Sequence, residues 1–523
     1  AFRFKTRRPR GGFVENIYVE RVRANVKRQA LYCDMLGSAR WVGELAQRYP
    51  AREITPLTPW FANISIHDVE ITGCSTLVDV SALPEKPVKN FFFGNVKAHC
   101  DRIGKICDAT KFSMKDVRIE SCDTVMRIDN CDYASFFGFS NVTTGSSVKI
   151  EKTGGECRYL NVQTYPLVPV NYQSIRPGEV WLDTEGKPIQ AHGFQVTFRE
   201  GKYYWYGEDK THTLFGTNRM FGGVRCYSST DFYNWKDEGR IIEPATDPHS
   251  PLHHCQKLER PHILYCAKTG RYVCWLKSQS NDGHFVILEA EHFMGPYHFV
   301  RNLKPNGFAV GDFDMYADPD TGKGYVWFER PHWEQICAEL SDDYTNVNGR
   351  YSEHFVGKVP PFTREAAAHF VMDGKHYIYT SGTTSYTPNP SEVAVFDDYH
   401  GEYTVLGNPH IGDEYAHSFC SQITSVIKIP GKDLYVAMAD RWLPHTNKTD
   451  IPKKDWQSFL TRYKDHRPYP KDFATPKVAD RFYTLVNPNQ DVYKATYVFL
   501  PIVVKDGIPM IEWKDEWKLE NYE

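Results

Sequence analysis

The chain has 523 residues, 41% of them hydrophobic and 14% aromatic, which is typical of a globular protein with two or three domains. Its formal net charge of −3 argues against nucleic acid and anionic membranes as partners. No apolar run approaches the ~20 residues that a membrane span requires, so no span is expected.

Residues 1–160 repeat a short pattern, in which Asn or Asp precedes Val or Ile and an alternating apolar run follows. The last four copies are 27, 21 and 25 residues apart, close to one coil of a right-handed parallel β-helix. These copies begin at Asp68, Asn95, Asp116 and Asn141. Cysteines at matching positions are expected to stack as buried thiols inside the coils: Cys74, Cys100 and Cys122. The sequence therefore predicts a partial β-helix.

The opening segment, FRFKTRRPRGGFVENIYVERV, resembles the C-terminal half of the polygalacturonase family, glycoside hydrolase family 28. Arg3 and Lys5 match the Arg-x-Lys pair with which that family binds an acidic sugar. The catalytic residues of that family lie in upstream coils that have no counterpart here. The resemblance implies a truncated, non-catalytic scaffold, and we expect the natural protein to be longer.

A linker is expected at 161–177, where prolines occur without periodicity, and a second repeat fills 178–523. A glycine followed by a basic residue precedes a Tyr-containing strand five times, at spacings of 69, 52, 52 and 57 residues. These glycines are Gly201, Gly270, Gly322, Gly374 and Gly431. The period is that of a four-stranded blade and predicts a five-bladed β-propeller. A hairpin at Gly507 is expected to close the ring, and a polar insertion is expected around 443–491.

Polar residues open four of the predicted innermost strands. Three are carboxylates, Glu259, Asp312 and Glu365, and the fifth strand begins with Gln422. Because inner strands line the central channel, these side chains are predicted to converge although they are far apart in sequence. A ring of this composition is typical of a sugar-cleaving site.

Glycosidic cleavage requires one carboxyl group that keeps its proton, since the leaving oxygen must be protonated. Glu365 is the predicted general acid. It is followed by three alanines, Ala366 to Ala368, which are expected to leave room for the substrate. The abundant aromatic residues are expected mainly to pack the blades.

The region 178–517 resembles glycoside hydrolase family 43, and within it the exo-β-1,3-galactanases. The resemblance rests on WLDT with IQAHG, YWYGEDK, STDFYNW, ERP, GPY, EA, PNP and DRW, in this order. It implies that Glu365 is the general acid and that Glu259 is an essential carboxylate binding the terminal galactose. It also implies that Asp312 binds the sugar and sets the pKa of the acid, and that Thr383 is a further sugar contact.

Most members of family 43 carry a base aspartate on the first inner strand, where this chain has Ala191-His192-Gly193. The galactanase subfamily is similar in lacking it. There a glutamine, matched by Gln422, is thought to orient or activate the water, including as its imidic acid tautomer. Inversion would place acid and base about 6.5 to 9.5 Å apart. Glu208, His192 and Trp442 are predicted to bind the substrate as well, although Glu208 and Asp209 could equally serve structure.

Two local features leave alternatives open. Where relatives offer a tyrosine to the sugar, this chain reads Asn281-Asp282-Gly283-His284, so His284 replaces that contact or the preferred sugar differs. The run His253-His254-Cys255 could bind a metal, but no second ligand cluster has suitable spacing, and a solvated or channel-edge role is favoured. No metal or cofactor is therefore expected for catalysis, although the family resemblance allows a structural calcium.

The sequence predicts an inverting exo-hydrolase that releases terminal galactose from β-1,3-galactan, with a polysaccharide or oligosaccharide as its partner. One alternative is a pectin-directed exo-hydrolase that removes arabinose or galactose side chains, suggested by the polygalacturonase-like segment. Another is a carbohydrate-binding propeller without catalysis, suggested by the missing base aspartate. The substrate implies a location outside the cytoplasm, in a bacterial periplasm or at the cell surface.

Overall fold

The computed structural model describes residues 2–165, 170–211, 221–279, 283–358, 360, 362–384, 386, 388–413, 416–442 and 494–523. The chain divides into two compact units, the first consisting mainly of Ala1–Val170 and the second running from Asn171 to Glu523. The change of unit falls inside the expected linker. The insertion expected around 443–491 lies outside the described residues. No described helix is long and apolar enough to cross a membrane.

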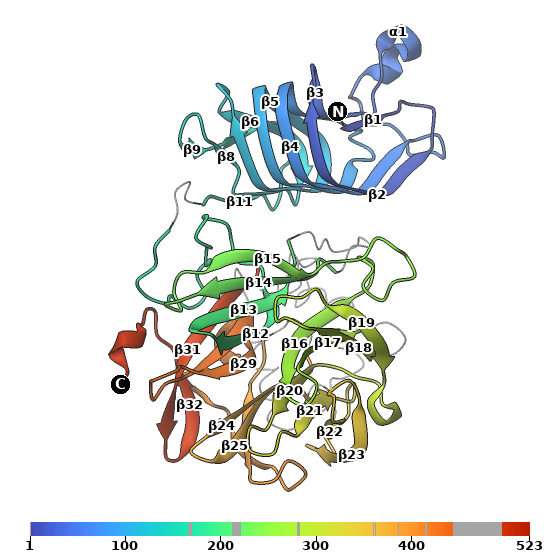
Figure 1. The fold of residues 1–523 in the computed structure, drawn as a ribbon. Helices are drawn as coiled ribbons and strands as arrows, with labels where there is room; N and C mark the ends of the chain where they lie inside the picture. Colours follow the sequence, from blue (N-terminus) through green and yellow to red (C-terminus); the bar gives the residue numbers. More distant parts are fainter. Residues whose placement is uncertain are drawn as a thin grey trace. The chain divides into compact units, whose positions relative to one another are not determined.

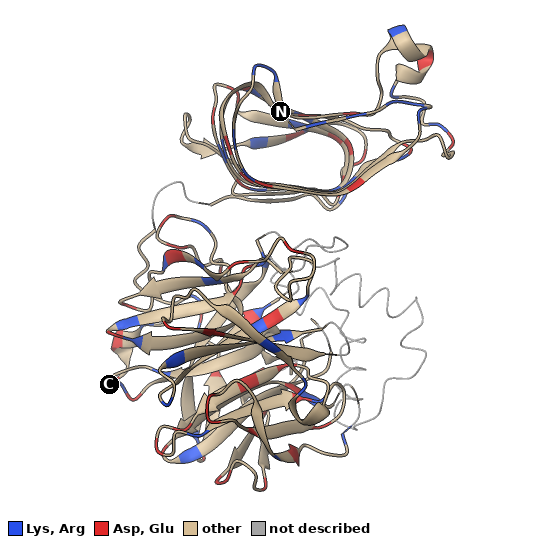
Figure 2. Ribbon diagram, turned by 45° about the vertical axis from the view of Figure 1, so that its right-hand side comes forward, with Lys and Arg blue, Asp and Glu red and all other residues tan. Residues whose placement is uncertain are grey.

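The first unit is built from parallel strands that stack as coils, as the repeat predicted (Figures 1 and 2). The two longest strands, β4 and β5, pair in parallel with apolar residues in register, such as Ile66 beside Phe93 and Val69 beside Val96. Its principal strands are β1 (Phe2–Lys5), β2 (Phe13–Asn25), β3 (Gln29–Asp34), β4 (Trp60–Ser81), β5 (Val88–Glu120), β6 (Val125–Asp132), β7 (Ser135–Phe137), β10 (Lys149–Gly154) and β11 (Asn161–Gln163). One continuous apolar core fills the coils.

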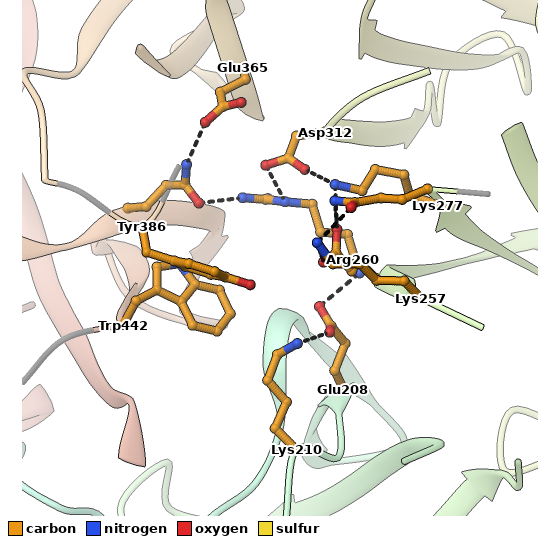
Figure 3. A pocket seen from close by; sticks show the side chains of 12 residues that line it. Glu208, Lys210, Lys257, Arg260, Lys277, Asp312, Glu365, Tyr386 and Trp442 are labelled. Carbon is orange, nitrogen blue, oxygen red and sulfur yellow. Dashed lines mark hydrogen bonds and ion pairs between the residues drawn. The ribbon is translucent and has the colours of Figure 1, made fainter. Parts of the chain in front are cut away.

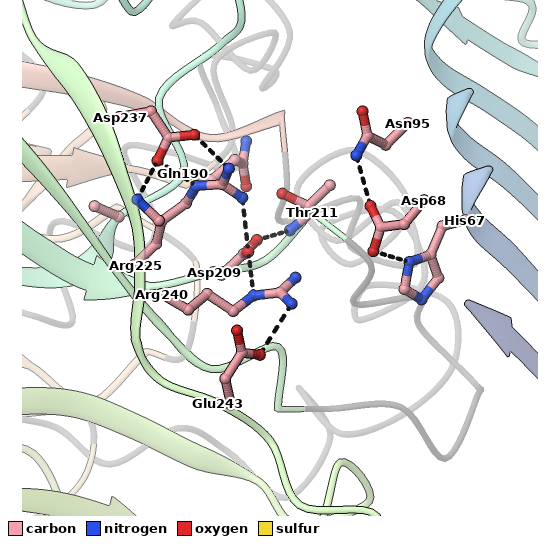
Figure 4. A network of polar contacts seen from close by, with 12 residues as sticks. His67, Asp68, Asn95, Gln190, Asp209, Thr211, Arg225, Asp237, Arg240 and Glu243 are labelled. Atoms are coloured by element: carbon pink, nitrogen blue, oxygen red, sulfur yellow. Dashed lines mark hydrogen bonds and ion pairs between the residues drawn. The ribbon is translucent and has the colours of Figure 1, made fainter. Parts of the chain in front are cut away.

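The repeated Asn and Asp residues mark the places where the long strands change direction. Asp68, Asn95 and Asp116 have φ values of 55°, 45° and 53°, a left-handed conformation that Asn and Asp adopt more readily than most residues. The Asn95 amide donates to Asp68 Oδ1 on the next coil at 2.6 Å (Figure 4). The repeated Asn and Asp residues are therefore explained by the left-handed conformation that the coil corners require.

Two of the three expected stacked thiols are where the repeat placed them. Cys74 and Cys100 are neighbours in the β4–β5 pairing and are 7% and 2% exposed. The prediction is wrong for Cys122, which is exposed because it lies two residues beyond the end of β5. Arg3 and Lys5 lie on β1, where Arg3 covers the Tyr32 ring and Lys5 approaches Asp34 at 3.9 Å. An acidic-sugar contact by this pair stays a prediction.

The second unit is a five-bladed β-propeller, which confirms the expected fold (Figure 1). Each of the first four blades is a meander of four strands in chain order. Their bounds are β12 (His192–Arg199), β13 (Lys202–Glu208), β14 (Val224–Ser229) and β15 (Lys236–Ile242); β16 (Leu258–Cys266), β17 (Arg271–Ser278), β18 (His284–Ala290) and β19 (His298–Leu303); β20 (Phe313–Ala317), β21 (Gly324–Glu329), β22 (Gln335–Leu340) and β23 (Val347–His354); β24 (Arg364–Met372), β25 (Lys375–Gly382), β26 (Glu392–Phe396) and β27 (Thr404–Gly407). The fifth blade contains β29 (Gln422–Lys428), β30 (Tyr435–Arg441), β31 (Thr496–Lys505) and β32 (Ile508–Glu512), with β28 (His410–Ile411) added at its outer edge.

The five repeated glycines occupy the turns between the first and second strands of the blades. All five have φ between 68° and 78°, which glycine adopts without a steric penalty. The hairpin at Gly507 has a different role from the one predicted, because it joins β31 to β32 within the fifth blade. The ring closes where β12 packs against β29. As expected, large aromatic side chains fill the blades, and Trp205, Trp275 and Trp327 are fully buried.

The central channel is filled by polar groups, with one contributed by each inner strand. The side-chain amide of Gln195 contacts His262 Nε2 at 2.7 Å, Asp314 Oδ1 at 3.4 Å and the Thr424 carbonyl at 3.5 Å. The Asp314 carboxylate also accepts a hydrogen bond from the His369 backbone N–H at 2.6 Å. We call this group of polar contacts the polar hub. It lies two to four residues further along each strand than the predicted site residues, and it therefore closes the channel beneath them.

Candidate active site

A cavity of about 130 Å³ lies at the entrance of the channel. Six of its wall residues come from the beginnings of inner strands or the residue just before one, and the sequence predicted four of these six. The others come from the ends of second strands and adjoining loops. Figure 3 shows charged side chains on one side of the cavity and two aromatic rings on the other. The lining residues are Glu208, Lys210, Lys257, Glu259, Arg260, Lys277, Gln279, Asp312, Glu365, Tyr386, Gln422 and Trp442.

The backbone turns the acidic side chains towards the cavity by means of β-bulges. The register of β16 shifts between Glu259 and His262, and that of β24 shifts between Glu365 and Ala368. The residue after each glutamate is left-handed, with φ of 52° at Arg260 and 50° at Ala366. A bulge re-aims the side chain beside it. Ala366 to Ala368 are at most 1% exposed and pack in the core, so the expectation that they make room for substrate is wrong.

Two basic side chains tie the site residues into one network (Figure 3). Lys277 bonds Glu259 Oε2 and Asp312 Oδ1, each at 2.6 Å. Arg260 bonds Asp312 Oδ2 at 2.9 Å through Nε and donates to Gln422 Oε1 at 2.9 Å through Nη2. In this network Glu259 and Asp312 each have a cation beside them, which offsets the cost of removing their charges from water.

The network keeps Glu259 and Asp312 ionised. Burial raises the pKa of Glu259, but Lys277, Lys257 and Lys210 outweigh it and hold that pKa well below its usual value. Burial likewise raises the pKa of Asp312, and Arg260 and Lys277 more than compensate, so the pKa of Asp312 is also lowered. Both groups can therefore only accept hydrogen bonds, as from sugar hydroxyls.

Glu365 has the opposite electrostatics. Burial, the charge of Glu329 and the charge of Asp312 together raise its pKa well above the ordinary value, and Lys277 and Arg260 offset this only in part. Among the described residues, no Lys or Arg is within ion-pair distance of its carboxyl group. Glu365 is therefore a carboxyl group that keeps its proton, as a general acid must.

Glu208 is also in the cavity wall, but it is paired. Its carboxylate accepts a short hydrogen bond from Lys210, and its Oε1 accepts one from the Arg260 backbone N–H at 3.1 Å. Burial raises its pKa against the opposing charge of Lys210. Asp209, next in sequence, points away into a buried cluster with Arg225 at 3.2 Å and Arg240 at 2.9 Å (Figure 4). Glu208 thus belongs to the site, while Asp209 serves the structure.

Gln422 lies closer to the acid than an inverting arrangement requires. Its Nε2 is 3.4 Å from Glu365 Oε1 and donates to Ser381 Oγ at 2.9 Å. The expected separation of about 6.5 to 9.5 Å between acid and base is therefore wrong for these two side chains. The physical reason is that β29 packs against β24 and β25, so the Gln422 amide reaches both Glu365 and Ser381.

A left-handed turn precedes Gln422. Ser418, Phe419 and Cys420 have φ values of 54°, 55° and 60°, which is strained for residues other than glycine. Asp413 holds this turn, because its Oδ2 accepts from the backbone N–H groups of His417 at 2.8 Å and Ser418 at 2.7 Å. Asp413 thus stabilises this strained turn immediately before Gln422, the residue expected to orient water.

Replacing Asp413 by Ala is expected to lower kcat by about 10- to 100-fold with little change in KM, because Gln422 loses its fixed position. Stability should also fall by about 1–3 kcal/mol, since two backbone donors lose their acceptor. Asp413 raises the pKa of His417 to about 9 although burial opposes it. The contribution of protonated His417 to the free energy of unfolding is therefore complete below about pH 6.5 and is lost as the pH rises through about 9.

Kinetics and thermal unfolding between pH 6 and pH 10 would check this prediction. Asp398→Ala is the control, because Asp398 caps an exposed turn in the fourth blade by accepting from the His400 N–H at 2.8 Å. Equal kcat in the Asp413 variant and in wild type would contradict the positioning role of the turn.

Two predicted sugar contacts lie outside the cavity wall. His192 is fully buried, so the prediction of a direct contact is wrong. Its Nδ1 pairs with Asp440 Oδ1 at 3.0 Å and its ring lies 5.6 Å from the Trp442 ring, so it supports the aromatic wall from behind. Thr383 is partly exposed and its hydroxyl bonds that of Thr363 at 2.8 Å. A sugar contact by Thr383 stays a prediction.

Trp442 forms the aromatic wall with Tyr386, whose ring is 5.4 Å away (Figure 3). A sugar ring packs its apolar face on such a surface. Neither Tyr386 nor the buried Lys277 was identified from the sequence, and Arg260 was noted only as part of a motif. The signal for Lys277 was available, since a lysine within an otherwise apolar strand is rarely buried without a partner.

The predictions for two loops have mixed outcomes. Asn281 and Asp282 lie outside the described residues, whereas His284 is buried at the start of β18 and does not line the cavity. Two clusters among the described residues bring three ligand atoms within 4.8 Å: His253-His254-Cys255, and Glu20 with His67 and Asp68. Neither offers the oxygen-rich ligand set that calcium prefers, so neither fits a structural calcium.

A propeller with an axial pocket in which Glu365 keeps its proton while Glu259 and Asp312 are ionised fits a glycoside hydrolase. Residues 194–425 match the model of glycosyl hydrolases family 43. This match lies wholly within the propeller, which is thus similar to family 43 glycoside hydrolase domains.

Solved structures extend the likeness. A family 43 β-1,3-galactosidase is 27% identical with a TM-score of 0.54, over 67% of this chain and 65% of its own. A second, solved with galactodeoxynojirimycin, is 26% identical with a TM-score of 0.54, over 66% of this chain and 100% of its own. An exo-β-1,3-galactanase from Phanerochaete chrysosporium, solved with galactose, is 21% identical with a TM-score of 0.51, over 66% of this chain and 68% of its own, and shows the shared fold. No curated protein matches the chain.

This chain spans 65% of the length of the first of these relatives, so the activity of the whole relative is not transferred to it directly. The β-helix unit lies outside the matched family range. Its resemblance to polygalacturonases stays a prediction.

Proposed function

We propose that this protein is an exo-acting, inverting β-1,3-galactosidase that removes terminal galactose from β-1,3-galactan, the backbone of plant arabinogalactan. The observation that carries the proposal is Glu365, a half-buried carboxyl that keeps its proton in the wall of a cavity of about 130 Å³. The two relatives above 25% identity are described as β-1,3-galactosidases, which supports the choice of substrate.

The site residues divide the reaction between them. Glu365 donates its proton to the glycosidic oxygen, and a water adds to the anomeric carbon from the opposite face and releases a proton to solvent. Glu259 and Asp312 accept hydrogen bonds from the sugar hydroxyls. Arg260 donates to Gln422 Oε1 at 2.9 Å, where the extra proton of an imidic acid would have to sit. This contact favours the amide form of Gln422, which orients the water.

The cavities favour removal of one sugar from the chain end. The polar hub closes the channel beneath the cavity, while a groove of about 700 Å³ adjoins it and shares Lys277, Gln279, Asp312 and Glu365 with it. The acid therefore stands between the two spaces, where the bond joining the terminal sugar to the rest of the chain would lie. Trp333, which is 61% exposed, lines the groove that would hold the remaining chain.

The test is hydrolysis of β-1,3-galactotriose, followed by proton NMR of the first product. Galactose released first as the α-anomer, with galactobiose as the co-product, is the expected result. Release of β-galactose would contradict inversion, and release of larger fragments from galactan would contradict exo action. β-1,4- and β-1,6-galactobiose and aryl arabinosides serve as matched substrates.

The same experiment separates the alternatives. Preference for an aryl arabinoside would favour a pectin side-chain hydrolase. Galactan binding without any turnover would favour a carbohydrate-binding propeller. The proposed reaction uses protein groups and water alone and requires no redox or nucleotide cofactor. Because plant galactan is outside the cell, we propose an extracytoplasmic location, such as a bacterial periplasm or cell surface.

A further inference from the structure

Glu329 is a second buried carboxyl near the site that the mechanism above does not use. It is the last residue of β21 in the third blade, and its side chain is 5% exposed. It lines the adjoining groove together with Asp312 and Glu365. Its position is therefore on the leaving-group side of the acid.

The backbone fixes Glu329 beside Asp312. Its carbonyl accepts from the Gly311 N–H at 2.6 Å, and its own N–H donates to the Asp312 carbonyl at 2.9 Å. A Cβ atom on Gly311 would lie 2.1 Å from Glu329 Oε2, so only glycine leaves room for this carboxyl. Oε1 accepts from the His332 N–H at 2.8 Å. The carboxyl is thus hydrogen-bonded at Oε1 and packed against Gly311 at Oε2, next to Asp312 in the chain fold.

The charges around Glu329 differ from those around the sugar-binding carboxylates. Asp312 and Glu259 each have a lysine or arginine within 3 Å. Among the described residues, the only basic side chain within ion-pair distance of Glu329 is the exposed His332 ring, 3.6 Å from Oε1. Burial, helped by the charge of Asp312 and opposed by the His332 N–H and Lys277, raises the pKa of Glu329 to about 7, so its negative field acts on the basic side of that pH.

We propose that Glu329 is a positioning residue for the hydrolysis, fixed against Gly311 so that its negative field keeps the proton on Glu365 until the glycosidic oxygen receives it. This inference rests on the proposed function, in which Glu365 is the general acid. It adds no chemical step, because Glu329 acts only through Glu365.

The groups that face Glu365 set the sign of the effect. Glu329 and Asp312 stabilise its protonated form, while Lys277 and Arg260 stabilise its ionised form. Without the negative charge of Glu329, the stabilisation of ionised Glu365 by Lys277 and Arg260 meets less opposition. The pKa of Glu365 then falls, and the proton is lost at lower pH.

The Glu329→Gln variant tests this. The basic limb of its kcat/KM profile is expected to move to lower pH by about one unit, so activity above the limb falls about tenfold while activity well below it is unchanged. KM should change less than about twofold, because Glu329 does not touch the terminal sugar. In Glu329→Asp, which keeps the negative charge, the basic limb should lie much closer to its wild-type pH. Glu334→Gln is the matched control, since Glu334 lies on the loop that follows Glu329, pairs with Arg330 at 2.8 Å and itself lines neither the cavity nor the groove.

Infrared titration of the protonated carboxyl band in wild type, Glu329→Gln and Glu365→Gln reports the proton on Glu365 without turnover. An unchanged titration and an unchanged basic limb in folded Glu329→Gln would overturn the inference. If the wild type binds galactan but does not hydrolyse it, the proposed function fails instead, and the infrared titration still decides whether Glu329 holds the proton.

Discussion

Replacing Glu365 by Gln is expected to lower kcat on β-1,3-galactobiose by about 10²- to 10⁴-fold, the usual contribution of a general acid. The amide fills the same volume and can still bond Gln422, so KM should change little. The loss should be much smaller on an aryl galactoside with an acidic phenol as leaving group, because that oxygen departs without a proton. The two substrates together separate loss of proton donation from loss of binding.

Steady-state kinetics on both substrates would measure the effect. Glu339→Gln is a suitable control, because Glu339 is a buried carboxylate of the third blade that pairs with Lys323 at 3.0 Å and lies outside the cavity wall. A similar loss on both substrates would contradict the role of Glu365 as the acid. The basic limb of the wild-type profile should lie well above ~4.3, the ordinary pKa of glutamate, because burial, Glu329 and Asp312 raise the pKa of Glu365.

Replacing Lys277 by Met is expected to lower the free energy of unfolding by about 3–5 kcal/mol at neutral pH. Methionine has a similar length, but it leaves the buried carboxylates of Glu259 and Asp312 without the ammonium group they share at 2.6 Å. The pKa values of both carboxyls should rise in the variant. Its deficit should therefore shrink as the pH falls and these groups take up protons.

Urea unfolding at neutral and acidic pH would measure the deficit. Lys257→Met is the matched control, because Lys257 pairs with the same Glu259 at 3.3 Å but its side chain is 34% exposed. A half-exposed pair contributes at most about 1 kcal/mol. Equal destabilisation by the two substitutions, or a Lys277 deficit that does not change with pH, would contradict the assignment of Lys277 as the central cation.

The period and turn chemistry of the chain were sufficient to predict both architectures. Glycines such as Gly201 and Gly374 recur because a left-handed turn residue is needed in each blade, and Asp68 and Asn95 recur because each coil corner needs the same conformation. The first acidic residue of an inner strand was a sound indicator of the cavity, since Glu259, Asp312 and Glu365 all line it.

Predictions that depended on side-chain direction fared less well. His192 opens an inner strand as Glu259 nearly does, yet its ring points to Asp440 and is buried. The alanines after Glu365 do not make room for substrate, because they are buried and pack in the core between the blades. Gln422 was placed in the right position, but its direct contact with Glu365 depends on a hydrogen-bond network with Ser381 and Arg260 that no sequence pattern describes.

The sequence by itself determined the fold and the strand ends that meet at the axis, because repeat period, turn residues and alternation are local properties of the chain. Only the tertiary structure decided which carboxyl keeps its proton. That depends on burial and on where Lys277, Arg260 and Glu329 lie, and these come from β17, β16 and β21, whose proximity arises only when the blades close into a ring.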